Sequence, residues 1–140
     1  GQLIDEDCAL QPSTSYGLSK LLAERLCNRM WLDEGVGSTV LRVFNPYGVG
    51  QRNSFLVPYI VRSLRERSPI ALRTPNAVRD FVYVEDVVEA LVLAAEPPLE
   101  GFRVMNIASG VGTEVKELVA LAEEIFGSGV KSRTLRSISH

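Results

Sequence analysis

The sequence predicts an α/β fold in which helices alternate with strands that pair in parallel. Segments with helical spacing follow short β-branched or apolar runs in regular alternation, a pattern typical of parallel sheets with crossover helices. The chain has 140 residues, of which 46% are hydrophobic and 23% are charged. These values suit a globular protein with one core. We therefore expect one domain over residues 1–140.

Four helices are expected, over residues of about 15–33, 54–67, 85–96 and 113–126. The first follows a loop over residues 1–14, with Ser13 or Ser15 as its N-cap. It stops at Gly35, since glycine commonly ends helices in the left-handed conformation. The last helix follows a glycine-rich turn and has Thr113 as its cap.

Four strands are expected, over residues of about 39–45, 70–73, 80–84 and 104–108. The first is apolar on both faces except at Arg42, as a buried parallel strand should be. Pro46, Gly48 and Gly50 should end it in a loop. The polar stretch 128–140 predicts no closing element.

Composition excludes several classes of function. A net charge of −2 does not indicate a positive surface for nucleic acid or an anionic membrane. No apolar stretch reaches the roughly 20 residues that span a bilayer. Cys8 and Cys27 form neither a disulfide framework nor a metal-spaced pair, so we expect a cytoplasmic protein with no metal site. The single histidine, His140, ends the chain, which begins with Gly1 rather than Met. We expect a piece of a longer protein.

Tyr16 and Lys20 carry the clearest chemical signal. They are four residues apart on a predicted helix and so share one face. A cation beside a phenol favours the phenolate, which makes a tyrosine usable as a base. The helical wheel puts both residues, with Cys27, in the arc expected to pack, and Glu24 and Asn28 outside it. A lysine on a packed face suggests a role, although a solvated surface lysine is the simpler alternative.

Two further segments place polar residues beside predicted strands. Asn45 ends a strand ahead of a glycine-rich loop, where ligands bind in open α/β sheets. Taken alone, the segment favours the simpler interpretation of an asparagine that ends the strand and starts a turn. Arg79 precedes a strand and could grip a phosphate with two hydrogen bonds. The alternative is a surface ion pair between Arg79 and Asp80, with Asp86 capping the next helix.

These segments together resemble the extended short-chain dehydrogenase/reductase family, in particular its nucleotide-sugar epimerases and dehydratases. The motifs that carry the resemblance occur in the family's order over most of residues 1–126, and they are YGLSK, LRVFNPYGVGQ, FLVPYI, VRDFVYVEDVVEAL and VMNIASGVGTEVKELV. The resemblance implies the C-terminal part of a Rossmann-type parallel sheet plus part of a small substrate-binding α/β region.

The resemblance also implies residue roles. Tyr16 matches the catalytic tyrosine that accepts a proton from a sugar hydroxyl. Lys20 matches its partner, which also contacts the nicotinamide ribose, and Phe44 matches a backbone contact to the nicotinamide portion of NAD. Asn45 and Arg79 match residues that bind the nucleotide-diphosphate sugar substrate.

By resemblance, the intact protein is an NAD-dependent isomerase of carbohydrate metabolism, similar to UDP-hexose 4-epimerases, that acts through a transient 4-keto sugar. A nucleotide-sugar 4,6-dehydratase is the same-class alternative. A non-catalytic remnant that binds a nucleotide sugar or a partner chain is the other. The family's glycine-rich phosphate loop and its catalytic Ser/Thr are absent from these residues. We therefore expect no tight NAD binding by residues 1–140 alone, and a homodimer when the protein is intact.

Overall fold

The computed structural model describes residues 4–96, 100–127 and 132–134. Contacts divide the chain into two compact units. The first unit holds the residues up to Phe44 together with Glu85–Ala108. The second holds Asn45–Val84 and the residues from Ser109 onward. The expectation of one incomplete domain stays a prediction.

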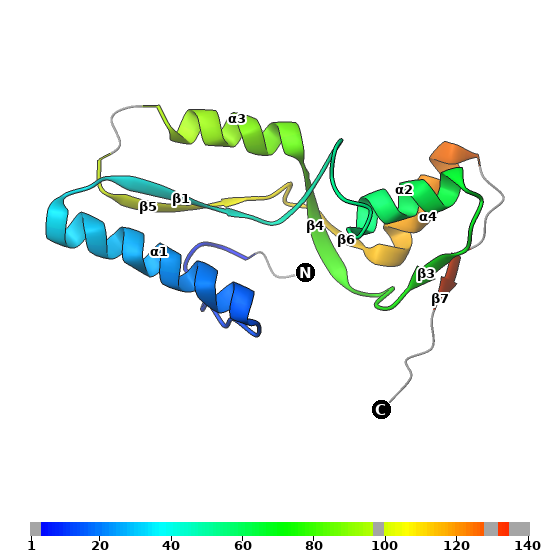
Figure 1. The fold of residues 1–140 in the computed structure, drawn as a ribbon, viewed down its shortest axis with the longest axis horizontal. Coiled ribbons are helices and arrows are strands. Elements are labelled where there is room, and N and C mark those ends of the chain that lie inside the picture. Colours follow the sequence, from blue (N-terminus) through cyan, green and yellow to red (C-terminus); the bar gives the residue numbers. More distant parts are fainter. Residues whose placement is uncertain (1–3, 97–99, 128–131, 135–140) are drawn as a thin grey trace. The chain divides into compact units, whose positions relative to one another are not determined.

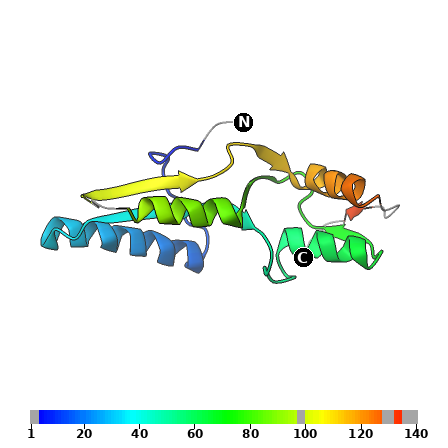
Figure 2. The same ribbon diagram turned by 90° about the horizontal axis from the view of Figure 1, so that it is seen from above.

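The first unit is a parallel strand pair with a helix on each face. Strand β1 (Ser38–Val43) pairs with β5 (Phe102–Ile107) in parallel. Helices α1 (Ser15–Glu34) and α3 (Val84–Ala94) run along opposite faces of the pair (Figures 1 and 2). This arrangement confirms the predicted α/β architecture with parallel pairing.

Helix α1 has the predicted extent but a different N-cap. The hydroxyl Oγ1 of Thr14 accepts a hydrogen bond from the backbone N–H of Gly17 at 3.0 Å. Neither Ser13 nor Ser15 caps the helix, because Thr14 holds the extended backbone that a cap requires. Gly35 ends the helix in the left-handed conformation at φ 68°, as predicted.

The predicted strand over residues 39–45 is divided in the structure. Strand β1 ends at Val43, and β2 (Asn45–Tyr47) belongs to a sheet of the second unit. Pro46 was expected to break the strand but lies within β2. Because β2 is an edge strand in the order β2-β4-β6, the missing N–H of proline can face away from the ladder.

The second unit contains two small sheets. In the first, β2 pairs in parallel with β4 (Val78–Tyr83), which pairs antiparallel with β6 (Gly112–Glu114). In the second, β3 (Ile70–Leu72) pairs in parallel with β7 (Ser132–Thr134). Strands β6 and β7 were not predicted, since each has only three residues and is defined by its partner rather than by a local pattern.

Two helices complete the second unit and build its core. Helix α2 (Leu56–Arg65) packs against α4 (Val115–Phe126). Six buried side chains from both helices and β3 form its hydrophobic cluster, and they are Ile60, Leu64, Ile70, Leu72, Val115 and Val119. Glu114, not Thr113, caps α4: its carboxylate and that of Glu117 form a reciprocal capping box.

Candidate functional site

Tyr16 and Lys20 lie together near the start of α1. The ammonium Nζ of Lys20 is 5.5 Å from the centre of the Tyr16 ring, within the range of a cation–π contact. The two side chains are therefore neighbours, as their helical spacing predicts, while the expected approach of the ammonium to the phenol oxygen stays a prediction. The prediction that they lie on a packed face is wrong, because Tyr16 is 73% exposed and Lys20 is exposed as well.

The packed face of α1 is turned by about one residue, or roughly 100°, from the predicted arc. Its half-buried residues are Gly17, Leu21, Glu24, Cys27 and Asn28. Glu24 and Asn28 had been placed outside the face. The physical reason is that apolar side chains surround this helix, so hydrophobicity alone did not select the side that meets β1.

Tyr16 and Lys20 line an open hollow between α1 and β1 of about 720 Å³. Its other walls are largely apolar and include Leu10, Pro12 and Val43. A phenol and an ammonium are thus presented at the margin of an apolar surface. This is a suitable place for proton transfer with a bound molecule.

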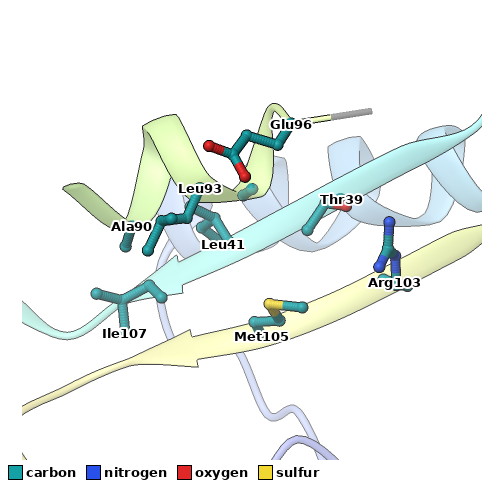
Figure 3. Close-up of a pocket in the computed structure, with 9 residues that line it drawn as sticks. Thr39, Leu41, Ala90, Leu93, Glu96, Arg103, Met105 and Ile107 are labelled. Atoms are coloured by element: carbon teal, nitrogen blue, oxygen red, sulfur yellow. The ribbon is translucent and has the colours of Figure 1, made fainter. Parts of the chain in front are cut away.

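A second hollow of the first unit lies on the opposite face of the strand pair, under α3, with a volume of about 490 Å³ (Figure 3). Leu41, Leu93 and Met105 line it, and Arg103 and Glu96 lie at its rim. It contains none of the predicted site residues. The hollow beside Tyr16 is therefore the candidate site of this unit.

The floor of the candidate site is fixed by an ion pair that the sequence analysis missed. Arg42 on β1 donates two hydrogen bonds to the carboxylate of Glu24 on α1, at 2.9 and 2.7 Å. The side chains are only 21% and 12% exposed, respectively. The guanidinium holds the pKa of the Glu24 carboxyl below its usual range, and Glu24 in turn raises the pKa of Arg42. The pair fixes α1, and hence Tyr16, on β1.

The same arginine ties the N-terminal segment to the strands. Arg42 also donates to the backbone carbonyl of Glu6 at 2.9 Å. The carboxylate of Glu6 accepts the backbone N–H of Asn106 on β5 at 2.6 Å. The Asn106 amide donates to the carbonyl of Ile4 at 3.0 Å. Arg42 was visible in the sequence as the one charge on an apolar strand, which was the signal for a buried partner.

Phe44 follows β1 at the end of the strand. Its backbone N–H donates to the carbonyl of Ile107 at 3.0 Å. The N–H is therefore used within the fold. Any backbone contact from Phe44 to a ligand would have to use its carbonyl oxygen.

Asn45 and Arg79 lie in the second unit, on neighbouring strands. Asn45 of β2 is in register with Phe81 of β4, and Arg79 is two residues before Phe81. Because side chains alternate along a strand, Arg79, Phe81 and Asn45 belong to one face of the sheet. The two predicted substrate residues therefore lie on the same face of this sheet.

The alternative of an Arg79–Asp80 ion pair is not what the structure shows. The guanidinium of Arg79 bonds only the neighbouring Val78 carbonyl, at 3.3 Å, within the described ranges. The carboxylate of Asp80 instead accepts hydrogen bonds from Ser109 and Gly110. Arg79 is exposed and remains available to an anion.

The described residues contain neither a membrane-spanning helix nor a cluster of metal ligands. None of the helices in 4–96 and 100–127 is both long and apolar enough to cross a bilayer. No group of three or more His, Cys, Asp or Glu side chains in the described part of the chain could hold a metal ion.

Fold and site together describe an α/β protein with a tyrosine–lysine pair beside an open hollow. The pattern of the NAD dependent epimerase/dehydratase family matches residues 1–108. The chain belongs to this family, as its motifs indicated.

Individual relatives agree with this assignment. A putative UDP-glucose 4-epimerase of Methanocaldococcus jannaschii is 34% identical over 131 residues, which cover 89% of this chain and 41% of that protein. The dTDP-4-dehydro-6-deoxyglucose reductase of Escherichia coli is 33% identical over 123 residues, covering 84% of this chain and 38% of that protein. The chain thus spans about two fifths of these relatives.

A solved structure shows the same fold. MoeE5 in complex with UDP-glucuronic acid and NAD superposes with a TM-score of 0.89 at 30% identity. The match covers 98% of this chain and 47% of that one. It confirms the predicted Rossmann-type α/β class.

Proposed function

We propose that the complete protein is an NAD-dependent nucleotide-sugar 4-epimerase, similar to UDP-hexose 4-epimerases, that acts through a transient 4-keto sugar. The observation that carries this proposal is the Tyr16–Lys20 pair at the edge of an open hollow, with the Lys20 ammonium 5.5 Å from the centre of the Tyr16 ring. The family and its UDP-sugar-binding members support it.

Tyr16 is the proposed base. Its exposed ring can reach a sugar hydroxyl in the hollow, and its oxygen accepts the proton of that hydroxyl. Lys20 is the proposed partner of Tyr16: its ammonium lies 5.5 Å from the centre of the Tyr16 ring, and a nearby positive charge favours the transient negative charge on the phenol oxygen. The same proton returns to the sugar oxygen when the 4-keto sugar is reduced. Tyr16 therefore acts as base and then as acid in one cycle.

The residues present fit a nicotinamide cofactor. NAD, when bound, supplies the reversible oxidation of the sugar carbon. Lys20 has no hydrogen-bond partner among the described residues and is exposed at the wall of the hollow, so it is free to bind a ribose hydroxyl. Phe44 offers its carbonyl oxygen at the end of β1. Tyr16, Lys20 and Phe44 would hold the nicotinamide end.

Asn45 and Arg79 are the proposed contacts to the nucleotide-diphosphate sugar. They share one face of the β2–β4 pair. The exposed guanidinium of Arg79 can bind a diphosphate with two hydrogen bonds. Asn45 can bind a sugar or diphosphate oxygen through its side-chain amide.

Two other enzyme activities and one non-catalytic function are the alternatives to a 4-epimerase. A 4,6-dehydratase uses the same tyrosine–lysine pair, and so does a 4-keto-sugar reductase, which the relative from Escherichia coli favours. A non-catalytic remnant would keep the fold and bind a nucleotide sugar or partner chain without turnover. We propose isomerase activity in cytoplasmic carbohydrate metabolism, and a homodimer, on family membership.

The test uses the complete natural protein with NAD and UDP-glucose. The proposal expects UDP-galactose to form, detected by chromatography, with no net reduction of the cofactor. A 4-keto-6-deoxy product would assign a dehydratase instead. Turnover only of a supplied 4-keto sugar with a reduced cofactor would assign a reductase. No conversion of any UDP-, dTDP- or GDP-hexose would leave the non-catalytic remnant.

A further inference from the structure

Asp80 lies on β4 directly between Arg79 and Phe81 and has an unusual number of partners. Its Oδ1 accepts the backbone N–H of Ser109 at 2.8 Å and the Ser109 hydroxyl at 2.9 Å. Its Oδ2 accepts the backbone N–H of Gly110 at 2.8 Å. Gly110 has a φ of 78°, so the loop turns sharply around the carboxylate. One side chain thus satisfies three donors of the loop that leads into β6.

The backbone of Asp80 orients Asn45. The Asn45 nitrogen Nδ2 donates to the Asp80 carbonyl at 2.9 Å. The amide cannot be turned over, because its oxygen would then face another carbonyl oxygen. One N–H of Asn45 is therefore used, and its Oδ1 and second N–H remain for other partners.

The two functions of Asp80 concern opposite faces of the same sheet. By strand alternation, Arg79 and Phe81 point to the face that carries Asn45, and the Asp80 side chain points to the other. Asp80 is also in register with Gly112 of β6, at the end of that ladder. The Asp80 carboxylate therefore holds β4 from the face opposite to the one that carries Arg79 and Asn45.

We propose that Asp80 is a positioning residue for binding of the nucleotide-diphosphate sugar. It holds the 109–110 loop behind β4, and so fixes the carbonyl that aims Asn45 and the backbone that presents Arg79. This inference rests on the proposed function. It adds a residue that touches the loop and Asn45 but not the substrate.

Asp80→Ala removes both carboxylate oxygens, and with them all three hydrogen bonds, and leaves the N–H groups of Ser109 and Gly110 without a protein partner. The β4–β6 ladder then loses its support at the Asp80–Gly112 end. We expect the dissociation constant for UDP to rise about tenfold, the effect of losing one hydrogen bond to a charged group at the site. Turnover at saturating substrate should change little, because Tyr16 and Lys20 belong to the other unit.

The experiment compares the complete natural protein with Asp80→Ala, Asp80→Asn and Glu89→Ala. Asp80→Asn is the conservative variant: its amide oxygen can still accept from Ser109, but its NH2 group faces the N–H of Gly110. Glu89→Ala is the control, since Glu89 is an exposed carboxylate with no hydrogen-bond partner in the part of the chain that the structure describes. The measurements are the UDP dissociation constant by calorimetry, KM and kcat for UDP-glucose, and amide hydrogen exchange at residues 109 and 110.

In Asp80→Ala we expect faster amide exchange at Ser109 and Gly110, together with a higher UDP dissociation constant and a higher KM. Asp80→Asn should change the same three quantities by a smaller amount. Glu89→Ala should leave all of them unchanged. A UDP dissociation constant unchanged in Asp80→Ala would overturn the inference, and so would a loss of kcat alone. If Asp80→Ala leaves amide exchange at Ser109 and Gly110 unaltered, Asp80 does not hold the 109–110 loop. If the wild type binds neither UDP nor a UDP-sugar, the proposed function fails, and the substrate role of Asp80 fails with it. The amide exchange result still shows whether Asp80 holds the 109–110 loop.

Discussion

Glu24→Gln tests the ion pair that fixes α1 on β1. The substitution keeps the shape of the side chain, but removes its charge and turns one acceptor into a donor facing the guanidinium of Arg42. Both side chains are largely buried, at 12% and 21% exposed. The remaining arginine charge would be left with the Glu6 carbonyl as its other acceptor.

The magnitude follows from burial. Breaking a fully buried pair by removing one partner costs about 3–5 kcal/mol, and an exposed pair contributes about 0–1 kcal/mol. The Glu24–Arg42 pair is mostly buried and partly compensated by Glu6, so we expect Glu24→Gln to lower the free energy of unfolding by about 2–3 kcal/mol. With a urea slope of about 2 kcal/mol per molar, the urea midpoint should fall by about 1–1.5 M.

The assay is urea unfolding of residues 1–140, followed by the fluorescence of Trp31, which is the single tryptophan of these residues and lies on α1. The control is Asp33→Asn, which breaks the Arg29–Asp33 pair on the same helix. That pair is 2.6 Å long but 69% and 44% exposed. It should therefore contribute only about 0.3–0.5 kcal/mol.

The pH dependence has a definite sign. Arg42 lowers the pKa of Glu24 from its ordinary value of 4.5, so the folded state favours the charged carboxylate. The stability that the pair contributes is present above about pH 4.5 and is lost as the pH falls through the lower folded pKa. The difference between wild type and Glu24→Gln should shrink over that acid range. Equal costs for Glu24→Gln and Asp33→Asn near neutral pH would refute the reasoning.

Two further predictions concern local structure. Thr14→Ala should cost about 1 kcal/mol of stability, because it removes the hydroxyl that accepts from Gly17 at the start of α1; thermal unfolding followed by circular dichroism measures it, and Ser13→Ala, outside the cap, should change nothing. Gly48→Ala should cost about 1–3 kcal/mol, because an added Cβ would meet Val84 Cβ at 2.9 Å and its Cγ1 even closer. An unchanged urea midpoint for Gly48→Ala would contradict that packing.

The extent of the first helix could be predicted from the sequence because its ends are local signals. Gly35 ends it as expected, and the cap lies at Thr14, within one residue of both predicted positions. Its orientation could not be predicted. Leu18, Leu22 and Leu26 are all exposed, so the apolar pattern gave no single face, and the pairing of Glu24 with Arg42 across 18 residues decided it.

The site was predicted only where its residues are close in the sequence. Tyr16 and Lys20 are one helical turn apart, and their proximity follows from helix geometry. One of the two alternatives for Asp80 paired it with its neighbour Arg79, but its carboxylate accepts from Ser109, 29 residues away. Nothing near Asp80 in the sequence signals that loop, because only the β4–β6 pairing brings it close.

The most direct test of the central proposal is the turnover of Tyr16→Phe in the complete natural protein with NAD and UDP-glucose. Tyr47→Phe is the control, since it also loses a phenol hydroxyl and can keep its ring packed 5.5 Å from that of Tyr83. If Tyr16 transfers the proton, its loss should lower kcat by about 10²–10⁴-fold while the UDP dissociation constant stays the same. A kcat for Tyr16→Phe equal to that of Tyr47→Phe would contradict the account.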